Sequence, residues 1–169
     1  NGNREAFETL YNRHQRRVFS VALNYFGGDI DKAGDITQQV FLKLFTGFSD
    51  FRGEAEFTTW LYRVTVNACI DEARKNRKFF GLADFFGLVD TKMKQEDRLQ
   101  QKEISDEVQK VVASLKPKFR LPILLKYVEG LSYDEIAKVL DCSIGTVSSR
   151  LNRGHKMLAQ KLGHLKNEI

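Results

Sequence analysis

Residues 130–151 constrain the fold most, because they read as two short helices joined by a tight turn. Ser132 and Glu135 have the spacing of a capping box, in which a hydroxyl and a carboxylate satisfy free backbone donors at a helix start. Ala137 supplies the small side chain that lets two helices approach, and Val147 is expected in the core of the second helix. The segment therefore predicts a helix-turn-helix, a motif typical of DNA-binding domains.

The turn of this motif is predicted at Asp141, where glycine is the commonest residue. Aspartate is among the few other residues that tolerate a left-handed backbone, and Ser143 is placed to cap the second helix. Apolar residues at helical spacing are expected to face the core: Ile144, Val147, Leu151 and Leu158. The opposite face carries groups that suit base edges and phosphates, although a solvated helix face is the alternative interpretation. This polar face holds Thr146, Ser149, Asn152, Arg153 and Lys156.

The rest of the chain shows no sustained alternation of apolar and polar residues, which predicts an all-α fold. Three apolar stripes predict helices that end at Gly27–Gly28, extend from about Asp29 to Gly47, and extend from about Phe57 to Arg77. With short connections, such helices form a bundle. Helices resume at about Ile104, and Pro117 and Pro122 are expected to form a corner before the helix-turn-helix.

We therefore predict two helical domains, residues 1–78 and 104–169, joined by a linker at 79–103. The linker is unusual for its large apolar side chains, which are expected either to pack on one of the domains or to contact a partner. These side chains are Phe79, Phe80, Leu82, Phe85, Phe86, Leu88 and Val89.

Charge and composition restrict the function further. The net charge of +5 and the pI of about 9.2 are compatible with a polyanionic partner, and the basic excess is concentrated in residues 60–78 and 141–169. Cys69, Cys142 and the three histidines have no metal-ligand spacing, so no metal or cofactor is predicted. The sequence contains no long apolar run or secretory signal, which predicts a cytoplasmic chain that is not inserted in a membrane.

The third predicted helix carries a polar face suited to single-stranded nucleic acid. At 100° per residue this face covers about 80°, with Trp60 at its edge. It holds Thr59, Arg63, Asn67, Arg74 and Arg77. Arginines pair with phosphates and aromatic rings stack on unpaired bases. The loop before the helix adds Phe48, Phe51 and Phe57, with Gly47 and Gly53, and such a flexible aromatic loop can hold an extruded base.

Three segments together resemble bacterial sigma factors of the extracytoplasmic-function group: residues 35–45, residues 51–67 and the helix-turn-helix. The resemblance covers nearly all of the chain except the linker. The order and spacing of the three segments make it specific. The resemblance implies an initiation factor that binds core RNA polymerase, directs it to specific promoters and promotes DNA opening. The DNA would open because the chain binds the open state more tightly than the closed duplex, without catalytic activity in this chain.

The resemblance also implies three sets of contact residues. The clamp helices of the polymerase largest subunit would contact Asp35, Gln38, Gln39 and Lys43, which from the residues alone are a solvated polar face. The minus-ten element, including a flipped non-template base, would contact Gly47, Phe51, Thr59, Trp60, Arg63, Asn67 and Arg74. The minus-thirty-five duplex would contact Lys126, Thr146, Ser149, Arg150, Asn152, Arg153 and Lys156.

Two further partners follow from the resemblance. The flap of the second-largest polymerase subunit would hold the carboxy-terminal domain, and an anti-sigma factor would inhibit the chain by covering both domains. Many family members have a basic residue where Ser148 stands and an alanine–arginine pair where Gly154 and His155 stand, so weaker DNA backbone contacts are expected here. Gly154 also costs about 1 kcal/mol of helix propensity relative to alanine.

Two other functions compete with this interpretation. A stand-alone helix-turn-helix transcriptional regulator would account for the carboxy-terminal domain. Such a regulator does not require the face from Thr59 to Asn67, which is suited to single-stranded nucleic acid. A nucleic-acid-modifying enzyme would need clustered carboxylates, a His–Cys site or a phosphate loop, and the sequence contains none of these.

Overall fold

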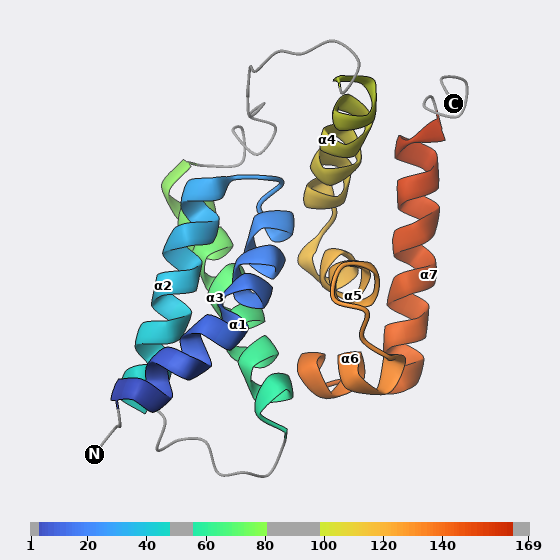
Figure 1. Cartoon of the computed structure of the whole chain (residues 1–169). Coiled ribbons are helices and arrows are strands. Elements are labelled where there is room, and N and C mark those ends of the chain that lie inside the picture. Colours follow the sequence, from blue (N-terminus) through green and yellow to red (C-terminus); the bar gives the residue numbers. More distant parts are fainter. Residues whose placement is uncertain (1–3, 48–55, 81–98, 164–169) are drawn as a thin grey trace.

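The computed structural model describes residues 4–47, 56–80 and 99–163. Within these ranges the chain forms seven helices and no strand, which confirms the all-α prediction (Figure 1). The helices are α1 (Arg4–Tyr25), α2 (Ile30–Gly47), α3 (Phe57–Phe80), α4 (Leu99–Ser114), α5 (Pro117–Tyr127), α6 (Tyr133–Leu140) and α7 (Ile144–Lys161).

Helices α1, α2 and α3 pack on one another as the predicted bundle. Gly27 and Gly28 have φ values of 67° and 93°, a left-handed conformation that ends α1 and lets the chain reverse. Asp29 then caps α2, because its Oδ1 accepts the Lys32 backbone N–H at 3.0 Å. The fully buried side chains of this core include Val18, Val21, Tyr25, Ile36, Val40, Leu44, Leu61 and Thr65.

Helices α4 to α7 form the second group, with α5 enclosed by its neighbours. Pro117 begins α5, but Pro122 lies inside the helix, so the predicted corner at Pro122 is wrong. The helix continues through the proline at the loss of one backbone hydrogen bond, because residues 119–125 are all buried by surrounding helices. Helix α4 begins at Leu99, before the predicted start at Ile104, since leucine, glutamine, lysine and glutamate favour helix.

The helix-turn-helix has the predicted local structure. Ser132 Oγ accepts the Glu135 N–H at 3.2 Å, and Glu135 Oε2 accepts the Ser132 N–H at 2.7 Å, which completes the capping box. Asp141 is left-handed at φ 48° and ψ 58°, and Ser143 Oγ accepts the Thr146 N–H at 3.1 Å. These contacts fix where α6 ends and α7 begins.

In the second helix Ile144 differs from its predicted position, and Gly154 has a packing role that the sequence did not indicate. Ile144 is 50% exposed, because it is the first residue of α7 and extends beyond the core that covers Val147 and Leu151. Gly154 is buried where α7 meets α5, and a Cβ there would lie 2.6 Å from Ile123 Cδ1. The glycine therefore permits close packing of α7 on α5, a role that its predicted cost in helix propensity did not indicate.

The two helical groups are in direct contact, which the sequence did not indicate. Helix α1 packs against α4 and α5, and α3 packs against α6 (Figure 1). The first contact includes Gln109 Nε2 donating to Asn24 Oδ1 at 3.1 Å. This interface determines which predicted site residues are accessible.

Candidate nucleic-acid interface

The predicted single-strand face of α3 is only partly exposed. Asn67 and Arg74 are exposed and Arg63 is half-buried. Thr59 is only 8% exposed, because the first turn of α3 packs against α1. Its predicted place on the accessible face is wrong. The side chain of Arg77 lies outside the described side chains.

The aromatic part of this face begins at the start of α3. The rings of Trp60 and Phe57 have centroids 6.0 Å apart, and Phe57 contacts the His14 ring of α1 edge-on at 5.2 Å. Gly47 is the last residue of α2, and α2 ends at the same end of the bundle where α3 begins (Figure 1). Phe51 lies outside the described residues.

A cavity of about 710 Å³ runs between α3 and the second helical group. Its α3 wall includes Arg63, Asn67 and Arg74, while Lys118 and Arg150 line the opposite wall. Its apolar lining comes from Val66, Ile70, Leu121, Val139 and Leu140, among others. Four basic side chains therefore gather around a partly apolar groove whose walls belong to different domains.

The exposed face of α7 carries most of the predicted duplex-reading residues. Ser149, Asn152, Arg153 and Lys156 are exposed. Thr146 is half-buried, and its hydroxyl is hydrogen-bonded to Ser143 Oγ at 2.9 Å.

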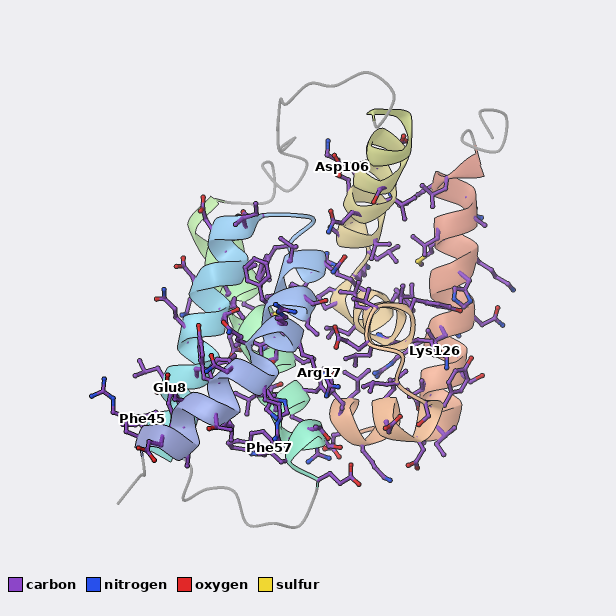
Figure 2. All side chains as sticks on the ribbon, in the orientation of Figure 1. Glu8, Arg17, Phe45, Phe57, Asp106 and Lys126 are labelled. Atoms are coloured by element: carbon purple, nitrogen blue, oxygen red, sulfur yellow. The ribbon has the colours of Figure 1, made fainter. Side chains whose placement is uncertain are left out.

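Arg150 and Lys126 differ from these residues because both are engaged within the protein. Arg150 is half-buried in the wall of the cavity, with Nη1 3.8 Å from Cys142 Sγ. Lys126 lies at the end of α5 (Figure 2), where its Nζ donates to the Leu131 carbonyl at 3.3 Å and lies 5.5 Å from the Tyr133 ring centroid. Of the predicted duplex-reading set, these two cations are the least available for DNA.

The predicted polymerase-binding residues of α2 lie together on the outside of the bundle. Asp35, Gln38, Gln39 and Lys43 are all exposed. The sequence prediction missed two apolar neighbours, Leu42 at 65% and Phe45 at 59% exposure, and Phe45 lies far from the second domain (Figure 2). The Phe45 ring contacts the Phe7 ring of α1 edge-on, with ring centroids 5.1 Å apart.

Three polar residues at the domain interface were also missed. Arg120 is 5% exposed and donates from Nη1 to the Tyr25 carbonyl at 2.8 Å. Tyr62 Oη donates to Glu129 Oε2 at 2.7 Å, and burial together with this bond and the carboxylate charge raises the pKa of Tyr62. The signal for Arg120 was present in the sequence, because it is the one charged residue in the apolar run 119–125.

The described residues offer no group of three metal-ligating side chains, and none of the helices described combines the length and apolar character needed to cross a bilayer. Cys69 is buried, which raises the pKa of its thiol to about 12.

A helix-turn-helix with an exposed polar recognition helix, joined to a bundle with its own basic face, defines a helical DNA-binding transcription protein. The sequence models of Sigma-70 region 2 and Sigma-70, region 4 match residues 10–79 and 105–158. The chain belongs to the family of ECF RNA polymerase sigma factors.

Named relatives match along nearly their whole length. The ECF RNA polymerase sigma-E factor of Haemophilus influenzae is 32% identical, over 95% of this chain and 89% of that protein. The sigma-E factor of Escherichia coli is 31% identical, over 95% and 88%. The ECF RNA polymerase sigma factor SigW of Bacillus subtilis is 29% identical, over 97% and 92%.

Two solved structures share the fold. The sigma factor RpoE of Bartonella quintana, in complex with the anti-sigma factor NepR, superposes with a TM-score of 0.74 at 23% identity, covering 94% of this chain and 98% of that one. CnrH, in complex with the cytosolic domain of CnrY, superposes with a TM-score of 0.69 at 24% identity, covering 96% and 91%.

Proposed function

We propose that this chain binds core RNA polymerase, directs it to specific promoters and promotes DNA opening as an ECF-type sigma factor. The observation that carries the proposal is the presence, in one chain, of a helix-turn-helix and a Sigma-70 region 2 bundle over residues 10–79. A stand-alone regulator would require only the helix-turn-helix domain. The chain supplies no chemistry of its own and acts where the polymerase acts, in the bacterial cytoplasm.

The two domains divide the work. Residues 1–78 bind polymerase and the minus-ten element, residues 104–169 bind the minus-thirty-five element, and residues 79–103 link them. The structure supports these limits only approximately, since α3 extends to Phe80 and α4 begins at Leu99. The backbones of Phe79 and Phe80 belong to α3, and the side chains of all seven apolar linker residues lie outside the described side chains.

Helix α3 provides the contacts to the opened strand. The exposed side chains of Asn67 and Arg74 contact the unpaired DNA strand. The Arg63 guanidinium also contacts this strand once it no longer donates to the Lys138 carbonyl of α6. Trp60, with Gly47 and Phe51 at the neighbouring loop, holds the flipped base by stacking. Unpaired bases exist only in the open promoter, so binding them shifts the equilibrium toward opening.

Helix α7 enters the major groove of the minus-thirty-five duplex. The hydroxyl of Ser149, the amide of Asn152 and the guanidinium of Arg153 meet base edges, and Lys156 meets phosphate. Thr146 lies at the start of the same helix. Arg150 and Lys126 contribute less, because each is already engaged within the protein.

The outer face of α2 docks on the polymerase clamp helices. Asp35, Gln38, Gln39 and Lys43 are exposed on the same helix as the exposed apolar residues Leu42 and Phe45. A small apolar centre with a polar surround is the usual composition of a protein interface. The polymerase flap holds the carboxy-terminal domain, and an anti-sigma factor is the expected inhibitor.

Two variants on different domains test this division. With core polymerase and a promoter selected from a library, Phe51→Ala is expected to keep duplex binding and to lose permanganate-reactive thymines in the opened region. Arg153→Ala is expected to weaken promoter binding itself. Glu8→Gln, on the outside of α1, serves as the control (Figure 2). An unchanged permanganate pattern for Phe51→Ala would refute the assignment of the base pocket.

A further inference from the structure

The cavity beside α3 is bounded by residues of both domains. Its volume of about 710 Å³ lies within the range of roughly 300–1,000 Å³ that is typical of small-molecule sites, which often lie between domains. One wall belongs to α3, and the other comes from α5, α6 and α7 (Figure 1). The cavity therefore has the size and the position of a site for one small molecule.

Cations from three helices converge on this cavity. Arg63 of α3, Lys118 of α5 and Arg150 of α7 all line it. No carboxylate of the described chain forms an ion pair with any of these three. Arg74 also lines the cavity, but it is paired with Asp71 at 3.6 Å. Like charges from separate helices are thus brought together, and a bound anion relieves their repulsion.

The three cations have donors suited to phosphate. Arg63 donates from Nε to the Lys138 carbonyl at 2.7 Å, which engages one of the five N–H groups of its guanidinium. Arg150 lies with Nη1 3.8 Å from Cys142 Sγ, which is a weak acceptor. Lys118 is exposed. Guanidinium groups bind phosphate through two parallel hydrogen bonds, and an ammonium binds it as a point charge.

The rest of the lining favours an anion that carries a flat apolar part. Ile70 and Leu140 are half-buried in the lining, together with the exposed Pro117. Asn67 adds an exposed amide, which both donates and accepts hydrogen bonds as the edge of a base does. Among the described residues that line the cavity, Asp141 is the one carboxylate, so cations are in excess. An apolar surface, an amide and several cations together match a phosphorylated nucleoside better than a bare phosphate.

We propose that this cavity binds a nucleoside polyphosphate. Arg63, Lys118 and Arg150 hold the phosphates, since three cations from separate helices match several phosphates better than one. The base lies on Ile70 and Leu140, where it replaces water on an apolar surface. Because the site is built from both walls, binding also stabilises the contact between the domains. The proposal does not depend on the proposed function, since neither DNA nor polymerase takes part in the site.

Calorimetric titration of the full chain with three probes tests the proposal. The probes are ATP, inorganic tripolyphosphate and adenosine, used at one salt concentration without divalent metal. ATP is expected to bind about tenfold more tightly than tripolyphosphate, because it also places a base on the apolar lining. Adenosine, which has no phosphate, is expected to bind more weakly than ATP. ATP should also raise Tm as its concentration increases.

Three variants locate the binding site. Lys118→Ala and Arg150→Ala are each expected to weaken the binding of both ATP and tripolyphosphate about tenfold, because a charged hydrogen bond to phosphate is lost. Ile70→Ala is expected to weaken the binding of ATP alone. Lys110→Ala in α4 and Arg16→Ala in α1 are the matched controls, because they remove the same charges from exposed positions outside the cavity. Circular dichroism establishes that each variant is folded.

Absence of ATP binding would overturn the proposal. Equal ATP affinities for the cavity variants and their charge-matched controls would overturn it too, because the nucleotide would then bind elsewhere on a basic surface. Equal affinities of the wild type for ATP and tripolyphosphate would show a bare anion site and would also contradict it. None of these results bears on promoter opening, which is measured separately with core polymerase, so the two proposals fail independently.

Discussion

Replacing Arg120 by alanine tests how the two domains are held together. The Arg120 side chain donates to three backbone carbonyls: Tyr25 in α1, and Ala113 and Leu115 at the end of α4. Among the described residues, no carboxylate forms an ion pair with Arg120. Burial consequently lowers the pKa of the guanidinium, although the group stays charged at neutral pH. Its contribution to stability comes from these hydrogen bonds and from its contact with the Tyr25 ring, whose centroid lies 4.6 Å from Cζ.

The magnitude follows from the groups left behind. Each buried acceptor without a donor costs about 1–3 kcal/mol, so three carbonyls cost about 3 kcal/mol at the lower limit. The vacated volume beside Tyr25 adds a cavity term. For a chain of this length 1 kcal/mol corresponds to about 2–4 °C in Tm, so Arg120→Ala is expected to lower Tm by about 6–12 °C or more.

Thermal unfolding followed by circular dichroism measures this change. Lys118→Ala is the control, because it removes a cation from an exposed position two residues earlier in α5. Its Tm is expected to stay within about 2 °C of the wild type. An Arg120→Ala variant with the same Tm as the control would show that the three carbonyls have other donors and would refute the reasoning.

Three further predictions concern single sites. Ser132→Ala should destabilise the chain by about 1 kcal/mol in urea unfolding, because the capping box loses its hydroxyl; an unchanged midpoint would contradict this. Burial, together with the charges of Arg17 and Arg13, lowers the pKa of His14 below its ordinary value of 6.5. Near that pH the unfolded chain therefore binds more protons than the folded chain. The free energy of unfolding should consequently fall as the pH drops through 6.5. His14→Gln should flatten this dependence, and an equal slope would count against it. Gly154→Ala should destabilise the wild type, yet stabilise an Ile123→Val background by about 1 kcal/mol, because the clashing Cδ1 is then absent; the same sign in both backgrounds would disprove the clash.

Local sequence signals predicted the parts of the fold that depend on local physics. Ser132, Asp141 and Ser143 act through their own backbone neighbours, so cap and turn positions could be read directly from spacing. Helical periodicity also identified the cores of α1 and α2. It failed at Ile144 and Thr59, because a helical wheel gives the direction of a side chain and not whether another element covers it.

The arrangement of the domains could not be predicted in this way. Tyr62 and Glu129 are 67 positions apart, and neither has a local signature that distinguishes it from an ordinary surface residue. Arg63 fits a DNA-binding face by composition, but its observed partner is a carbonyl of the other domain. A backbone acceptor leaves no trace in residue type, so this contact required the structure.

The contact residues of the candidate site also divide into those whose exposure follows from the helix face and those whose surroundings depend on the other domain. The exposed positions of Asn67, Asn152 and Arg153 agree with their predicted faces, while their contacts to DNA stay predictions. The structure restricts Arg150 more than composition suggested, because the side chain lines the cavity between the domains.

Transcription reconstituted with core RNA polymerase tests the central claim most directly. The full chain is added to core enzyme on a promoter library, and transcript starts and permanganate-reactive thymines are mapped together. The account predicts initiation at a defined set of promoters, with opening that depends on the chain and is lost with Phe51→Ala. Promoter binding without any start or opening, or starts that do not depend on the chain, would contradict it.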